Sequence, residues 1–93
     1  MTFSSTAVTI SACNSAGRNC GSKTISATLL NYSAGTAVAV SGTPPGNLKV
    51  AISPQGGGIF SINIAAVNNT RTTNSVTFTA GSCGTQKVNI TTK

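Results

Sequence analysis

The sequence predicts an all-β protein, and three observations carry that prediction. Apolar residues alternate with Ser, Thr and Asn through most of the chain, which is the period of a half-buried strand. Clusters of Gly, Pro, Asn and Ser separate the alternating runs. No window of useful length has apolar residues at the i, i+3, i+4 spacing of an amphipathic helix. The chain has 93 residues, so we expect a single domain over residues 1–93.

Seven runs show the alternation, and we expect each of them to be a strand. Val, Ile, Phe and Thr, which dominate these runs, are favoured on a pleated, half-buried surface. Phe60 and Phe78 are in phase with their apolar neighbours, so we expect both in the core. In chain order, the residues expected to face inward are Val8 and Ile10; Ile25, Ala27 and Leu29; Val38 and Val40; Leu48, Val50 and Ile52; Phe60, Ile62 and Ile64; Val76, Phe78 and Ala80; and Val88 and Ile90.

Turn-forming residues mark the ends of these strands. The segment 81–84 is expected to be the tip of a final hairpin. Seven short strands with this spacing predict a seven-stranded antiparallel Ig-like β-sandwich, and a small Greek-key barrel is the alternative. The turn segments are residues 14–19, 31–35, 42–47, 54–58, 68–74 and 81–84.

A set of short motifs lies in the C-terminal half, over residues 50–92. They are Ala51-Ile52-Ser53-Pro54 followed by three glycines, then Ile62-Asn63-Ile64-Ala65-Ala66-Val67-Asn68-Asn69-Thr70 with Arg71, then Val76-Thr77-Phe78-Thr79 and Lys87-Val88-Asn89-Ile90-Thr91. In this order the motifs resemble bacterial Ig-like surface modules, especially the BACON type. The resemblance implies a module that spaces or presents other domains on a bacterial surface. Glycan binding has been proposed for some such modules, but this chain has no Trp and one Tyr from which to build an aromatic sugar platform.

The charge composition excludes many kinds of chemistry. The chain has six Lys and Arg residues and no Asp, Glu or His, whereas roughly a tenth of a typical chain is acidic. It therefore offers no side-chain carboxylate or imidazole as a general base or as a member of a catalytic triad. Carboxylate ligands for Ca²⁺ or Mg²⁺ and His ligands for zinc are also missing. We expect a protein that is not an enzyme and that uses no cofactor or metal.

The three cysteines suggest one disulfide and one leftover thiol. Cys13 and Cys20 bracket the first loop, and a disulfide between them contributes roughly 2.5 kcal/mol by the loop-entropy relation. Such a bond points to an oxidising compartment, so we expect an extracellular or cell-surface location. Cys83 lies in the last turn, at the opposite end of a sandwich of this kind. It is either a free thiol or pairs with a neighbouring molecule, in which case a head-to-tail bond would build a fibre.

The cationic residues are dispersed along the sequence and form no basic run. The simpler interpretation is that they keep the protein soluble and discourage pairing at strand edges. An anionic surface is the alternative partner, whereas nucleic acid is not expected because Phe60 and Phe78 are in phase with the core. No apolar run is long enough to span a membrane, and residues 1–5 lack the pattern of a signal peptide. The six cations are Arg18, Lys23, Lys49, Arg71, Lys87 and Lys93.

Two functions remain open at this point. The first is a non-catalytic structural, spacer or adhesion module of a cell-surface or extracellular protein, with neighbouring domains as its partners. The second is a self-assembling subunit of an extracellular filament or of a virion surface. Assembly of that kind would use strand addition, an intermolecular disulfide or both. Residues 2–11 are the candidate strand for addition, because they start the chain and carry no charge.

The composition also makes a prediction about pH. Apart from the C-terminal carboxyl, no group of the chain titrates between about pH 1 and about pH 6. Acid denaturation acts mainly through carboxylates and His, so the melting temperature should stay nearly constant between about pH 2 and about pH 6. Thermal unfolding followed by circular dichroism at fixed salt measures this, and a clear drop across that window would refute it.

Overall fold

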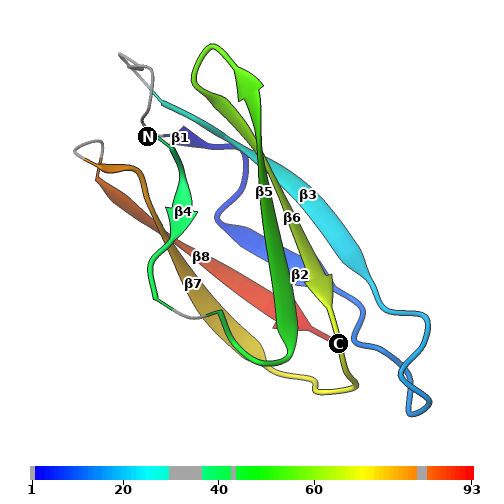
Figure 1. The fold of residues 1–93 in the computed structure, drawn as a ribbon. Helices are drawn as coiled ribbons and strands as arrows, with labels where there is room; N and C mark the ends of the chain where they lie inside the picture. The colour runs from blue at the N-terminus through cyan, green and yellow to red at the C-terminus, as the bar shows by residue number, and fades with distance from the viewer. Residues whose placement is uncertain (1, 30–36, 43, 82–83) are drawn as a thin grey trace.

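The computed structural model describes residues 2–29, 37–42, 44–81 and 84–93. These residues contain no α-helix, and their strands form two four-stranded sheets that face each other (Figure 1). The prediction of an all-β protein is thus confirmed. The strands are β1 (Thr2–Phe3), β2 (Ala7–Ile10), β3 (Ser22–Thr28), β4 (Ala39–Val40), β5 (Leu48–Gly56), β6 (Ile59–Ala66), β7 (Thr73–Thr79) and β8 (Thr85–Thr92).

Sheet A has the strand order β1-β3-β6-β5 and is antiparallel throughout. Sheet B has the order β2-β8-β7-β4 and is mixed, because β2 runs parallel to β8. The prediction of seven strands, all antiparallel, is therefore wrong in two respects: eight strands form, and one pair is parallel. Both departures come from the N-terminal segment, which was expected to form a single strand.

The N-terminal segment divides because its two halves belong to different sheets. Phe3 pairs with Ala27 in sheet A, whereas Val8 pairs with Ile90 in sheet B. Ser4 ends the first half, since its N–H donates to the Ser26 carbonyl at 2.8 Å and its Oγ accepts from the Ser26 N–H at 2.9 Å. Hydroxyl–backbone bonds of this kind compete with a continuing ladder, so the chain leaves sheet A here and joins sheet B three residues later.

The core lies between the two sheets and contains most of the residues that the alternation predicts, together with Cys13 and Ala66. Phe60 is 4% exposed and Phe78 is fully buried, and the rings of Phe3 and Phe78 lie with their centroids 5.4 Å apart. Val40, Val50 and Ile52 are only partly buried and pack against the edge of the core. The other residues predicted to face inward, from Val8 to Ile90, are all buried.

The molecule is a rod with principal extents of 44 × 20 × 19 Å, and β1, the first described strand, and the C-terminus lie towards opposite poles (Figure 1). One pole carries the turn between β5 and β6, where Gly57 and Gly58 both have positive φ, as a two-residue type I′ hairpin turn requires. The other pole carries the loop from β2 to β3, the loop from β6 to β7, and the C-terminus.

A close approach between two backbones fixes the start of β3. The Gly21 N–H donates to the Ser11 carbonyl at 2.8 Å, and the Gly21 carbonyl accepts from the Ala66 N–H at 3.0 Å. A Cβ atom on Gly21 would lie 2.5 Å from the Ser11 nitrogen and 2.8 Å from its carbonyl oxygen. Backbone atoms cannot rotate away as a side chain can, so only glycine fits between Ser11 and Ala66.

We predict that Gly21→Ala destabilises the fold by about 1–3 kcal/mol, because the added methyl group overpacks a backbone crossing. Gly46→Ala is the matched control, since a Cβ atom there would meet no atom within 4 Å and the residue has no positive φ. This control should be neutral or should stabilise slightly. Urea unfolding measures both, and equal effects of the two substitutions would contradict the prediction.

Candidate functional site

Three segments meet at one end of the rod, which we call the disulfide pole. It consists of residues 11–21, residues 67–72 and Lys93, together with the first two residues of β3 and of β5, which start beside them. The Cys13 N–H donates to the Asn68 carbonyl at 2.9 Å and so joins the first two segments. The Ala12 N–H donates to the Lys93 carbonyl at 2.8 Å, and the Lys93 N–H donates to the Ile10 carbonyl at 3.0 Å. The C-terminal residue is therefore held in place by backbone bonds on both sides.

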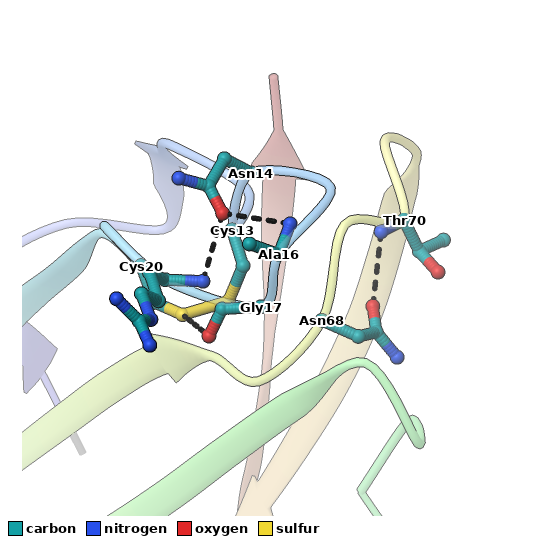
Figure 2. Close-up of a disulfide and its surroundings, with 8 residues drawn as sticks. Cys13, Asn14, Ala16, Gly17, Cys20, Asn68 and Thr70 are labelled. Atoms are coloured by element: carbon teal, nitrogen blue, oxygen red, sulfur yellow. Dashed lines mark hydrogen bonds between the residues drawn. A yellow bond between two sulfur atoms is a disulfide. The ribbon is translucent and has the colours of Figure 1, made fainter.

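The predicted disulfide between Cys13 and Cys20 is present (Figure 2). Cys13 is fully buried and belongs to the hydrophobic core, whereas Cys20 is exposed. The bond thus fastens the outer end of the loop to a residue that is itself held by the core. Cys83, the third predicted site residue, lies outside the described residues, and its pairing stays a prediction.

The side chain of Asn14 organises the loop inside the disulfide ring. Its Oδ1 accepts from the N–H groups of Ala16, at 3.0 Å, and Arg18, at 2.9 Å (Figure 2). The Asn14 N–H in turn donates to the Arg18 carbonyl at 2.8 Å, and the Gly17 N–H donates to the Asn14 carbonyl at 2.9 Å. Because the loop satisfies its own backbone groups in this way, it has a defined shape and presents Arg18 to solvent.

The neighbouring loop is held by Thr92, one of two buried polar residues in the described part of the chain. The Thr92 hydroxyl donates to the carbonyls of Thr70, at 2.9 Å, and Thr72, at 3.1 Å, and accepts from the Thr72 N–H at 3.0 Å. Within the loop, the Asn68 Oδ1 accepts from the Thr70 N–H at 3.0 Å (Figure 2). Arg71, between the two clamped threonines, is exposed.

The fold gathers at this pole the cations that are dispersed along the sequence. Arg18 lies in the disulfide loop, Arg71 lies in the β6–β7 loop, and Lys93 ends β8. Lys23 and Lys49 are each the second residue of a strand that starts here, and they pair with Ile64 and Ala65 of β6, respectively. All five are exposed. The sixth cation, Lys87, pairs with Thr77 nearer the opposite end of β8.

These side chains can bind by charge and by hydrogen bonds. The described residues form no pocket and contain no group of three or more potential metal ligands. The donors at the pole are guanidinium, ammonium, amide and hydroxyl groups, which suit a partner rich in anionic oxygens.

Sequence reasoning found the disulfide but missed the gathering of charge and the role of Thr92. Part of the signal for the gathering of charge was present in the sequence. Arg18 and Arg71 lie in the first and fifth predicted turns and Lys49 closely follows the third, and alternate turns of an antiparallel sandwich share an end. The signal for the second was also present, because Thr92 continues the inward phase of Val88 and Ile90 and is therefore a polar residue at a core position.

Comparison of the chain with protein-family models, with curated proteins and with solved structures found no match. Among the residues that the structure describes, none belongs to a helix long and apolar enough to cross a membrane.

We predict that Thr92→Val destabilises the protein by about 1–3 kcal/mol, because it removes the hydroxyl that pairs with Thr70 and Thr72 while keeping the shape of the side chain. Thr91→Val is the matched control, since the Thr91 hydroxyl pairs only with the Thr73 hydroxyl at the surface. The control should stay within about 0.5 kcal/mol of the original protein. Denaturant unfolding compares them, and a neutral Thr92→Val would show that the clamp does not hold the loop.

Proposed function

We propose that the chain is a non-catalytic Ig-like module that spaces or presents other parts of a cell-surface or extracellular protein. The rod shape carries the proposal, because the chain enters at one pole and leaves at the other (Figure 1). Copies of the module, or different domains, that are joined in series through these two poles form an extended string and do not fold back on one another. The disulfide supports an oxidising location.

The strand order supports the Ig-like assignment. If β1, β3, β5 and β6 are taken as strands A, B, D and E, sheet A has the order A-B-E-D of an Ig-type sandwich. The other sheet then contains strands C, F and G as β4, β7 and β8, and β2 lies beside G as a second part of the first strand. The resemblance of residues 50–92 to bacterial Ig-like modules agrees with this assignment.

The outer faces of the sheets support a role in spacing or adhesion. The outward positions of β3 are Ser22, Thr24, Ser26 and Thr28, and those of β7 are Thr73, Ser75, Thr77 and Thr79. These short hydroxyl side chains are well hydrated, and they offer hydrogen bonds without a nucleophile-activating base.

A tandem of two copies joined from Lys93 to Met1 tests the module directly. We expect each copy to fold as it does alone, so the melting temperature stays the same and small-angle scattering shows a particle about twice the 44 Å length of one copy. A particle no longer than one copy, or a loss of folded structure, would overturn the proposal that the module acts as a spacer.

A second function, self-assembly into a filament or virion surface, is favoured by one observation. Residues 2–10 form an edge of both sheets, carry no charge and bury Val8 and Ile10. The same segment could fill the equivalent place in a neighbouring copy by strand exchange. The Cys13–Cys20 bond leaves no free thiol at the disulfide pole, so an intermolecular bond from Cys83 would join two Cys83 residues unless the disulfide is exchanged.

Sedimentation velocity over a range of concentrations, with and without reductant, separates the two functions. A monomer under both conditions supports the spacer. Polymers that persist in reductant support strand exchange, whereas a dimer that reductant dissolves supports a bond between two copies of Cys83.

A further inference from the structure

The disulfide pole is the strongest unassigned feature of the molecule, because charge is distributed so unevenly along the rod. Five of the six cations lie there, and Lys87 is the exception. The chain has no Asp, Glu or His, so no acidic side chain neutralises them. The pole is about 20 Å across, which is less than the Debye length of about 30 Å at about 0.01 M salt and two to three times the Debye length of about 8 Å at physiological salt. The potentials of its charges therefore add most strongly at low salt.

The shape of the pole selects an extended partner. The cations come from two loops, two strand starts and the C-terminal end of β8, and the described residues form no pocket that could hold one anion. They do not follow a groove along the rod, as a site for a linear polymer would. Positive charge that is gathered at one end of the rod instead suits a flat anionic surface, which the rod would contact with that end.

An exposed apolar residue at the same pole indicates what kind of surface this is. Val67 is 46% exposed and follows β6 directly, on the outer face of sheet A beyond Ala65. Cations around an apolar side chain are the combination that binds a membrane interface, where the cations meet headgroup phosphates and the apolar group enters the interface. Arg71 is exposed in the same β6–β7 loop as Val67, so its guanidinium group is available to a headgroup phosphate.

Among the described residues of the pole there is no aromatic side chain on which a base could stack: Phe3, Phe60 and Phe78 pack in or against the core. Single-stranded nucleic acids are held largely by such stacking. The chemistry of the pole therefore favours lipid headgroups over nucleic acid.

We propose that the disulfide pole docks end-on on a bilayer that contains anionic phospholipids. The rod then stands upright on the membrane, with its Gly57–Gly58 turn pointing away from it. This docking does not depend on the module acting as a spacer, so the two proposals fail separately.

Sedimentation with vesicles of equal parts phosphatidylglycerol and phosphatidylcholine tests the docking, with pure phosphatidylcholine vesicles as the reference. We expect binding only to the anionic vesicles, and we expect it to disappear when sodium chloride rises from about 0.01 M to about 1 M, which shortens the Debye length from about 30 Å to about 3 Å. Equal binding to both vesicles, or no binding to either, would overturn the proposal.

Two matched pairs of variants test the orientation. Arg71→Gln and Lys87→Gln each remove one exposed charge, but only the first lies at the pole. We expect Arg71→Gln to lower the partition coefficient about fivefold, from about 1 kcal/mol for each basic residue at an anionic surface, and Lys87→Gln to leave it nearly unchanged. Equal losses would show that net charge alone, and not the pole, drives the binding.

Val67→Ser and Ile59→Ser form the second pair. The two side chains are 46% and 45% exposed; Ile59 begins β6, and Val67 directly follows the other end of this strand. Val67→Ser should weaken vesicle binding and Ile59→Ser should not, while circular dichroism confirms that both variants are folded. The reverse order would overturn the end-on geometry. A duplex DNA fragment that competes the protein away from the vesicles at equal phosphate concentration would overturn the assignment to lipid.

Discussion

The fold depends on a single constraint, which is that the alternate residues in the middle of each long strand must be apolar and face the opposite sheet. With no side-chain carboxylate in the chain, no ion pair between side chains can form, so none contributes to stability. What remains is the burial of Val, Ile, Leu and Phe between the sheets, the backbone ladders and one disulfide. Among the residues that the structure describes, the buried polar residues are Asn47 and Thr92, and both lie towards the disulfide pole.

Most of the core could be predicted from the sequence because alternation reports directly which side of a strand is buried. The alternation does not show which other strand pairs with a given strand in the sheet. The division of the N-terminal segment into β1 and β2 was missed for this reason, since Phe3 and Val8 have the same local pattern but pair in different sheets. The third predicted strand is reduced to Ala39–Val40, although Val38 is still buried as the pattern requires.

The sequence analysis predicted the disulfide of the candidate site, but it did not predict that the cations gather at one pole. Cys13 and Cys20 are only seven residues apart, so a tight turn in the loop between them brings the two cysteines together, whatever the rest of the fold is. Arg18 and Arg71, by contrast, are distant in sequence and meet at one pole only because the strands between them reverse direction. The same reversal gathers cations that are dispersed along the sequence at one end of the rod, and the proposed docking on an anionic membrane is argued from this charged end.

Exchanging two neighbouring residues of β6 tests the governing constraint most directly. Ile62 is fully buried, and Asn63 faces outward, where its Nδ2 donates to the Thr24 hydroxyl. The double variant Ile62→Asn, Asn63→Ile keeps the composition and the charge but places a polar residue at the inward position and an apolar residue at the outward one. The control Ser61→Asn, Asn63→Ser exchanges two outward positions. Urea unfolding should show that the first variant has lost its cooperative transition and that the second keeps it to within about 1 kcal/mol. A cooperative transition of undiminished stability in the first variant would contradict the account.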